Sequence, residues 1–431
     1  MNFLKKQSPV RIISLGFALV ILIGSVLLSL PCNIRDGVTL RYIDALYMST
    51  SAVCVTGLLT VDAGDTFTPL GQFFLGMLIQ VGGLGVTAVG TGVILAMGKK
   101  INLKARNLIR EAGNLDSGKG VIRFIRLVFL TTVTFELAGA ALSFLVFRKN
   151  FPPLKAAGVS LFHSVASFNN SGFDILGGGQ NLIPYQDDVL LNVVTCALVI
   201  FGGIGFLVIR EVIAKRFRWK KLSMHAKVVL FMSLVLTAAG TVLLKLTEDI
   251  TWMGAFFTSV SARTAGFSTF PLGSFSGAGL LTVIVLMVIG ASPGSTGGGI
   301  KTTTCYVLFE GIRSSATNTS EKAFRYAVPA DAFRKAAVIT LLAIGIVLSG
   351  TYILVILEPG VPFLDALFEM SSAFGTAGLS TGISAGLCDA AKILTILIMF
   401  IGRLGPLTIA SLWYFTKGER VSYPEGNIAI G

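Results

Sequence analysis

Four short stretches decide the fold: VCVTGL at residues 53–58, FNNSGF at 168–173, ARTAGF at 262–267 and FGTAGL at 374–379. The fifth residue of each stretch is a glycine, and an aromatic residue lies ten positions before it. The four glycines are Gly57, Gly172, Gly266 and Gly378. One element repeated along a chain is typical of an internal structural repeat. The sequence therefore predicts four related units.

Long apolar runs flank every copy of this element. The runs before the motifs cover about residues 11–30, 121–147, 224–246 and 332–357, and the runs after them about 69–98, 188–215, 277–312 and 389–416. Hydrophobic residues make up 53% of the 431 and charged residues 13%, so the solvent of this chain is largely lipid. Runs of this length form membrane-spanning helices rather than barrel strands.

The segment that connects the two runs of a unit is too short and too polar to span, so it is expected to enter the membrane and turn back. The predicted fold is an all-α multi-pass membrane protein with eight transmembrane helices. They form four parallel helix–re-entrant pore loop–helix units around a pseudo-fourfold central pore. The predicted units are residues 1–98, 99–217, 218–312 (with an interrupted second helix) and 313–416, followed by a cytoplasmic tail at 417–431.

The placement of basic residues predicts one orientation for all four units. The net charge is +13, and 26 of the 35 Lys and Arg lie within residues 5–11, 99–126, 210–227, 301–335 and 417–420. Basic loops next to membrane helices stay in the cytoplasm, so both termini are expected there. Asp62, Asp65 and Asp174 then lie on the outer side. Membrane orientation explains this charge better than binding of nucleic acid, which is not expected as a partner.

Enzyme chemistry finds little support in the sequence. The five cysteines form no CxxC pair and there are two histidines, so no metal or redox cluster is expected. Residues 294–304, GSTGGGIKTTT, resemble a phosphate loop but lack its spacing. No nucleophile–base pairing is recognisable. The chain is therefore not expected to be an enzyme or to carry a cofactor.

Parallel repetition gives the four loops a common depth in the membrane. Non-helical backbone is tolerated there only where it faces protein or water. Glycine lets each chain turn so that carbonyl groups point inward, and rings of carbonyls can replace the hydration shell of a monovalent cation. The alternative is that these glycines only allow close helix packing. Their aligned context favours an ion-selective filter.

On these motifs, and on FIGRLGP at 400–406 and Tyr423-Pro424, the chain resembles the Trk/Ktr/HKT superfamily of potassium transporters, most closely the Ktr membrane subunit. The resemblance covers essentially the whole chain. It implies K⁺ uptake through a gated, channel-like pore in a bacterial-type plasma membrane. A secondary carrier that couples K⁺ to Na⁺ or H⁺ is the alternative. The resemblance also implies a homodimer on a ring of cytosolic nucleotide-binding regulatory subunits, with Na⁺ as a candidate activator.

The resemblance implies that main-chain oxygens of the four motifs hold the ion. The implied filter residues are Cys54, Val55, Thr56, Gly57, Asn169, Asn170, Ser171, Gly172, Arg263, Thr264, Ala265, Gly266, Gly375, Thr376, Ala377 and Gly378. The implied K⁺ ligands are the carbonyls of Val55, Thr56, Asn170, Ser171, Thr264, Ala265, Thr376 and Ala377. Gly57 favours potassium, because sodium-selective plant relatives carry Ser there. Cys54 departs from the Thr that is common in relatives.

Pro and clustered Gly interrupt the second apolar run of the third unit, which breaks a helix. The resemblance implies an intramembrane gate loop there, and a surface linker is the alternative. The implied gate residues are Gly290, Ala291, Ser292, Pro293, Gly294, Ser295, Thr296, Gly297, Gly298, Gly299 and Lys301. Lys301 is expected to extend to the cytoplasmic surface, with contact to a regulator as the alternative.

Four further charged residues lie in or beside the apolar runs. Arg403 is near the middle of the last run, where a charge costs about 2.5–3.5 kcal/mol unless it is partnered or hydrated. The resemblance implies that Arg403 contacts the gate loop and repels cations, and a structural pair with a carbonyl or Glu is the alternative. Arg263 is expected to brace its loop from behind. Glu369 is expected to brace backbone N–H groups or Arg263, whereas Glu136 has no partner that the sequence identifies.

Overall fold

The computed structural model describes residues 9–96, 121–329 and 331–411. Within these ranges the chain is helical, apart from one antiparallel hairpin of β1 (Lys322–Ala323) and β2 (Tyr326–Ala327). The predicted cytoplasmic tail at 417–431, Tyr423-Pro424 and most of the basic stretch at 99–126 lie outside the described residues.

Four long helices correspond to the apolar runs that precede the motifs. They are α1 (Pro9–Leu28), α7 (Val121–Phe147), α11 (Met224–Thr247) and α15 (Ala332–Leu357). Their bounds agree with the predicted runs to within two residues. Each contains a stretch that is long and apolar enough to cross a membrane. Their outward side chains are apolar as well, for example Leu19 on α1, Leu130 on α7 and Leu341 on α15, which suits contact with lipid.

A short helix leads into each motif, as the sequence predicts. These helices are α2 (Tyr42–Val53), α8 (Pro153–Phe168), α12 (Trp252–Ser261) and α16 (Phe363–Gly375). Proline at or just before the first turn favours the start of α8 and α16, and the Thr251 side chain accepts the Gly254 N–H at the start of α12. Each short helix packs against the long helix that precedes it.

The helices that follow the motifs differ from the prediction, which placed a single break in the third unit. All four are interrupted. The pairs are α4 (Pro69–Leu84) with α5 (Val86–Ala96), α9 (Val189–Ile204) with α10 (Phe206–Ala214), α13 (Gly277–Val288) with α14 (Thr302–Thr317), and α17 (Asp389–Leu404) with α18 (Pro406–Ser411). The break between α9 and α10 bends the chain by 98°.

Glycine backbone conformation explains three of these breaks. Gly85 has φ 85° and ψ 131°, Gly205 has 98° and 138°, and Gly405 has 89° and 139°. Side chains other than glycine are strongly disfavoured in this region, and it is incompatible with a continuing α-helix. Consequently four described helices could each cross a membrane by length and composition, or five if the bent pair α9–α10 is counted as one span, while α4 and α13 are shorter apolar helices.

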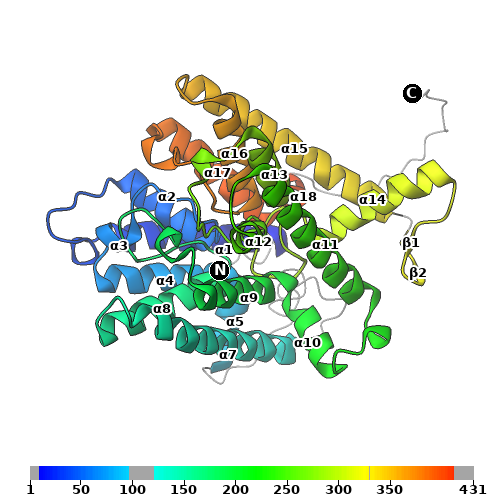
Figure 1. Cartoon of the computed structure of the whole chain (residues 1–431), viewed down its shortest axis with the longest axis horizontal. Helices are drawn as coiled ribbons and strands as arrows, with labels where there is room; N and C mark the ends of the chain where they lie inside the picture. The colour runs from blue at the N-terminus through cyan, green and yellow to red at the C-terminus, as the bar shows by residue number, and fades with distance from the viewer. Residues whose placement is uncertain (1–8, 97–120, 330, 412–431) are drawn as a thin grey trace, which may run out of the picture.

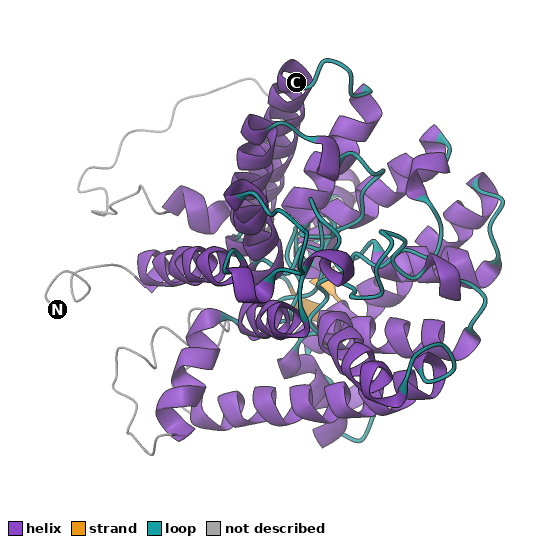
Figure 2. Ribbon diagram, turned by 90° about the vertical axis from the view of Figure 1, so that its left-hand side faces the viewer, coloured by secondary structure: helices purple, strands orange, loops and turns teal. Residues whose placement is uncertain are grey.

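Shorter helical turns lie in the connecting loops. They are η2 (Pro31–Asn33), α3 (Ala63–Thr66), η3 (Ile183–Tyr185), η4 (Trp219–Lys221), η5 (Leu272–Ser274) and η6 (Ser384–Gly386). Helices form the outside of the molecule, and several loops converge at its centre (Figures 1 and 2). Aromatic side chains of the motif regions, including Phe168, Phe173, Phe267 and Phe374, are completely buried in this central part.

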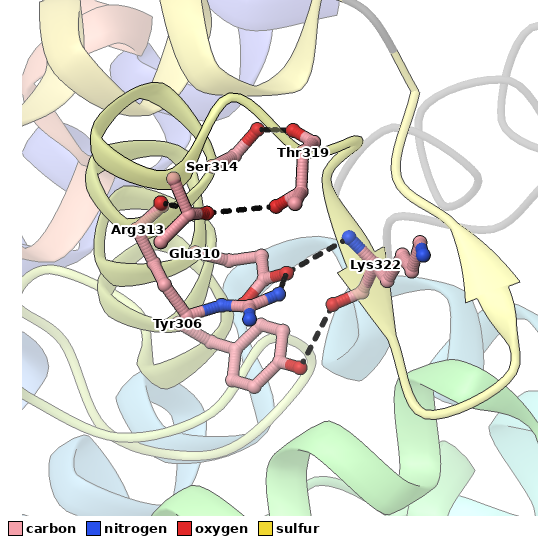
Figure 3. Close-up of polar contacts among 7 residues, drawn as sticks. Tyr306, Glu310, Arg313, Ser314, Thr319 and Lys322 are labelled. Atoms are coloured by element: carbon pink, nitrogen blue, oxygen red, sulfur yellow. Dashed lines mark hydrogen bonds and ion pairs between the residues drawn. The ribbon is translucent and has the colours of Figure 1, made fainter.

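The β1–β2 hairpin docks on α14 (Figure 3). Glu310 Oε1 accepts the backbone N–H of Lys322 at 2.9 Å, and the Tyr306 hydroxyl donates to the Lys322 carbonyl at 3.2 Å. Phe324 in the hairpin turn contacts the rings of Trp219 and Phe231. The hairpin therefore connects α14 to α11 and to the turn before it.

Candidate functional site

The four motif glycines meet at the centre of the molecule. Their φ angles are 98° at Gly57, 70° at Gly172, 77° at Gly266 and 81° at Gly378, a range that favours glycine. A Cβ atom built on Gly57 would lie 3.2 Å from the Cα of Gly172 and 3.2 Å from the Cα of Gly378. We call these four residues the glycine ring.

Each ring glycine also touches the carbonyl that precedes the next glycine in the chain. A Cβ on Gly57 would lie 2.5 Å from the Ser171 oxygen, one on Gly172 2.8 Å from the Ala265 oxygen, and one on Gly266 2.9 Å from the Ala377 oxygen. A Cβ on Gly378 would collide with the Thr56 oxygen, which closes the cycle. A side chain at any of the four positions would displace a main-chain carbonyl.

A second backbone feature repeats two residues before each glycine. Val55, Asn170, Thr264 and Thr376 have φ angles of 51°, 58°, 67° and 48°. Left-handed backbone is uncommon for residues other than glycine, and especially for β-branched ones. Strain of this kind persists where the surroundings enforce it and is frequent at functional sites. Sequence reasoning identified the glycines but not these strained neighbours, because propensity gives no signal for them.

A cavity of about 290 Å³ adjoins the glycine ring. Gly57, Gly266 and Gly378 line it, together with the carboxyl-bearing residues Asp62 and Asp174. Asp62 Oδ2 accepts the Gly179 N–H at 2.7 Å, and Asp65 Oδ2 accepts the Gly178 N–H at 2.8 Å. The carboxylates of Asp62 and Asp65 thus hold the loop after the second motif in place beside the cavity.

The predicted gate loop is buried inside the molecule, so the alternative of a surface linker is wrong. Ala291, Ser292 and Thr296 are at most 1% exposed, and Gly290 and Gly297–Gly299 are buried too. Cβ atoms on Gly297 and Gly298 would collide with the side chains of Thr264 and Thr376. The glycines therefore allow this loop to lie directly against the third and fourth motifs.

Hydrogen bonds attach the gate loop to the end of α9. Ser292 N donates to the Gly203 carbonyl at 3.0 Å, and Thr296 N donates to the Gly202 carbonyl at 3.2 Å. The Gly294 carbonyl in turn accepts the N–H of Phe206, the first residue of α10, at 3.1 Å. The break at Gly205 frees these backbone groups, and the gate loop satisfies them.

Arg403 connects three parts of the chain. Its guanidinium donates to the carbonyl of Thr296 in the gate loop and to the carbonyls of Gly82 and Gly83 at the end of α4, the last at 3.3 Å. No carboxylate pairs with it among the described residues. Its partners are carbonyls, which agrees with the alternative of a structural pair with a carbonyl. One of these carbonyls, that of Thr296, belongs to the gate loop, which agrees with the contact that the resemblance implies.

Two other basic residues can now be assigned contacts. Lys301 does not extend to the cytoplasmic surface as expected, because Nζ turns back and donates to the Gly297 carbonyl at 2.9 Å and the Gly298 carbonyl at 3.2 Å. Arg263 does lie behind its motif, where it donates to the Ser233 carbonyl at 3.2 Å.

The two buried glutamates have partners that the sequence did not identify. Within the described ranges, Glu369 binds neither Arg263 nor the backbone N–H groups that were expected. It accepts from the hydroxyls of Ser380, at 2.8 Å, and Ser384. Glu136 Oε1 accepts from Nδ2 of Asn169, in the second motif, at 3.0 Å. These partners lie 11, 15 and 33 residues away in sequence, beyond the reach of local patterns.

A further glycine repeat lies at the ends of three of the helices that follow the motifs. Residues 82–85 read GGLG, 202–205 GGIG and 402–405 GRLG, each just before a helix break. A Cβ atom on Gly82, Gly202 or Gly402 would collide with a carbonyl in the last turn of the short helix in the same unit, that of Val53, Phe168 or Phe374. The correspondence of Arg403 with Gly83 and Gly203 is visible in the sequence, whereas the close contacts and the breaks are not.

Comparisons with known proteins agree with this architecture. The TrkH family model, described as cation transport protein, matches residues 10–248 and 222–416. The chain is 36% identical to the Ktr system potassium uptake protein B of Bacillus subtilis strain 168, over 98% of this chain and 97% of that protein. It is 35% identical to the potassium/sodium uptake protein NtpJ of Enterococcus hirae, over 99% and 98%.

A solved structure shares the fold. The crystal structure of the potassium transporter TrkH from Vibrio parahaemolyticus superposes with a TM-score of 0.75 at 19% identity, and covers 95% of this chain and 86% of that one. Together with the full-length relatives and the repeated motif geometry, this likeness makes the protein a multi-pass membrane protein. The chain belongs to the TrkH family of cation transport proteins.

Proposed function

We propose that this chain is the ion-translocating membrane subunit of a Ktr/Trk-type potassium uptake system. The observation that carries the proposal is the closed glycine ring, in which each of four equivalent loops packs its glycine against a main-chain carbonyl of the next loop. Carbonyl oxygens are the ligands that replace water around K⁺ in selective pores. The names of the full-length relatives, which are potassium or potassium/sodium uptake proteins, support the same conclusion.

In this proposal the filter ligands are the main-chain oxygens of the two residues before each ring glycine. Val55, Asn170, Thr264 and Thr376 have left-handed backbone, which in this proposal turns these oxygens toward the ion. The hydroxyls of Thr56, Thr264 and Thr376 are buried and have no hydrogen-bond partner among the described residues. A cation and its remaining water molecules would satisfy such groups.

The gate is proposed to be the buried loop at residues 290–301, held shut by Arg403. This loop packs against two of the four motifs, and Arg403 fixes Thr296 to the end of α4. A guanidinium beside a cation path also repels cations electrostatically. Opening then requires the loop to move away from Arg403 and from the carbonyls of α9.

Several further features belong to the same proposal. They are the eight spans in four units with pseudo-fourfold symmetry, the inner-membrane location with cytoplasmic termini, the homodimer, the cytosolic nucleotide-binding subunits and Na⁺ as an activator. In the eight-span arrangement each helix pair interrupted by a break crosses the membrane as one bent span. The carrier alternative would require ionisable side chains at the ion site, whereas the glycine ring offers main-chain carbonyls.

Growth of a potassium-uptake-deficient bacterium at low K⁺ tests the proposal. Cells that express the chain with its cytosolic partner should grow, and Gly266→Ser should abolish or strongly reduce growth, since a Cβ there would lie 2.9 Å from the Ala377 oxygen. Gly345→Ser is the matched control, because no atom of the described residues lies within 4 Å of a Cβ at that helical position.

Failure of the intact, membrane-inserted chain to restore growth would contradict potassium uptake. Growth that survives Gly266→Ser unchanged would instead refute the filter assignment. A fixed stoichiometric requirement for Na⁺ or H⁺ in proteoliposome flux would favour the carrier.

A further inference from the structure

A second cavity, of about 270 Å³, lies between α9 and α11. Its walls include Val199 and Ile204 of α9, Leu230 and Leu234 of α11, and Val260 of α12. Leu234 is 70% exposed and α11 is one of the four long apolar helices, so the mouth of this cavity is on the outer, lipid-facing side of the helices. We call it the α9–α11 crevice.

One charged side chain lines this apolar crevice. Arg263 donates to the Ser233 carbonyl at 3.2 Å, to Ser233 Oγ at 3.4 Å and to Thr237 Oγ1 at 3.5 Å. All of these acceptors are neutral, and the buried Nε has no hydrogen-bond partner among the described residues. No described Asp or Glu forms an ion pair with Arg263. The crevice therefore combines apolar walls with a positive charge that the described chain does not neutralise.

We propose that the α9–α11 crevice binds a single-chain fatty acid, with the carboxylate on Arg263 and the hydrocarbon chain along α9 and α11. A carboxylate is the planar anion that a guanidinium binds with two parallel hydrogen bonds. Burying an unpaired charge is unfavourable, so a ligand that neutralises Arg263 gains more than hydrophobic contact. The cavity is smaller than the roughly 300–1,000 Å³ of pockets for drug-sized ligands, which favours one acyl chain over a two-chain phospholipid.

The crevice also reaches the gate loop. Ala291 lines it, and so does Gly203, whose carbonyl accepts the Ser292 N–H. A bound fatty acid would thus contact both the third motif, through Arg263, and the point where the gate loop is attached to α9. Binding itself does not depend on the proposed transport function.

Photolabelling of the full chain in lipid nanodiscs tests the site. The probe is decanoic acid with a diazirine on its chain, and the competitors are decanoate and decan-1-ol. Labelled peptides are expected from residues 199–204, 230–237 and 256–260. Decanoate should compete about tenfold better than the alcohol, as expected for a charge-assisted hydrogen bond.

Two substitutions sharpen the test. Ser233→Leu fills the crevice while leaving the Ser233 carbonyl in place for Arg263, so it should reduce labelling several-fold. The matched control is Ser349→Leu on α15, where the serine is exposed and bonds only to carbonyls of its own helix. Arg263→Gln should keep chain binding but remove the preference for decanoate over decan-1-ol.

Four outcomes would overturn the proposal. Three come from the labelling: labelling confined to other peptides, equal competition by the two competitors in the unmodified chain, or labelling unchanged in Ser233→Leu. Cross-links from this surface to a second copy of the chain, in place of fatty-acid labelling, would identify the crevice as a protein interface and also overturn it. If Arg263→Gln fails to fold, the comparison of Ser233→Leu with Ser349→Leu still decides the result.

Discussion

At Arg403 one side chain holds several backbone groups whose contacts have to change if the gate loop moves. Its three acceptors are carbonyls, one in the gate loop and two at the end of α4. A hydrogen bond to a charged group contributes about 1.5–3 kcal/mol, and about 1.4 kcal/mol changes an equilibrium constant tenfold. Arg403→Gln should therefore raise K⁺ leak through the closed protein by about tenfold or more.

Flux from K⁺-loaded proteoliposomes without the regulatory subunit measures this leak. Arg148→Gln, at an exposed position after α7, is the control for loss of one arginine charge. A folded Arg403→Gln variant with unchanged leak would show that the side chain is structural and does not hold the gate.

Glu136 acts on the second motif through one acceptor atom. Glu136 is buried, and Nδ2 of Asn169 donates to three acceptors: Glu136 Oε1, Gln80 Oε1 and the Val165 carbonyl. Glu136→Leu removes an acceptor from a buried donor and should lower the free energy of unfolding by about 1–3 kcal/mol, with a loss of K⁺ over Na⁺ selectivity. Glu136→Gln keeps an oxygen acceptor and should be milder on both counts. Equal effects of the two substitutions in thermal unfolding and flux assays would mean that the charge, and not the acceptor, matters.

At the scale of elements, the helix breaks connect backbone conformation to the gate. Gly85 and Gly205 have nearly the same dihedral angles, so replacing either with Ala should cost about 1–3 kcal/mol in backbone strain. Their surroundings differ. A Cβ on Gly205 would lie 2.7 Å from the carbonyl of Pro293 in the gate loop, whereas in the described part of the chain no atom lies within 4 Å of one on Gly85.

Gly205→Ala should therefore change K⁺ leak, while Gly85→Ala should lower only thermal stability. The two variants control for each other, since they share the strain and differ in the contact. Equal leak in both variants would show that the contact between Gly205 and the gate loop does not affect gating.

Elements with a local sequence signal were predictable, and those that depend on distant contacts were not. Apolar run length located α1, α7, α11 and α15, and the aligned motifs located the short helices before them. The breaks at Gly85, Gly205 and Gly405 were missed because glycine is also common in continuous membrane helices, so its presence alone does not specify a positive φ. The direction of the Lys301 side chain was mispredicted because the snorkelling rule takes account of one helix and the membrane surface only. The carbonyls of Gly297 and Gly298, which Lys301 binds instead, belong to the folded gate loop.

Across the whole molecule, the first and the last units have to meet for the ring to close. α17 packs against α2, and at this junction Lys392 Nζ binds Asp44 Oδ1 at 2.6 Å with both side chains buried. Arg41 binds Asp44 at 3.0 Å and Asp389 at 2.9 Å, but its side chain is 58% exposed. The buried pair joins residues 348 positions apart, which no sequence window would have paired.

Breaking the buried pair should loosen this junction more than breaking the exposed one. Asp44→Asn leaves the Lys392 ammonium buried without its counter-ion and should lower the free energy of unfolding by about 3–5 kcal/mol, whereas Arg41→Gln should cost about 1 kcal/mol or less. The double variant Asp44→Leu with Lys392→Leu should recover most of the loss, because an apolar pair of similar size avoids the desolvation of two charges. Thermal unfolding of the unmodified chain, Asp44→Leu, Lys392→Leu and the double variant in one detergent gives the coupling energy of the buried pair. Additive effects of single substitutions at Asp44 and Lys392 would show that the ion pair does not hold the first and last units together, and that packing between α2 and α17 closes the ring by itself.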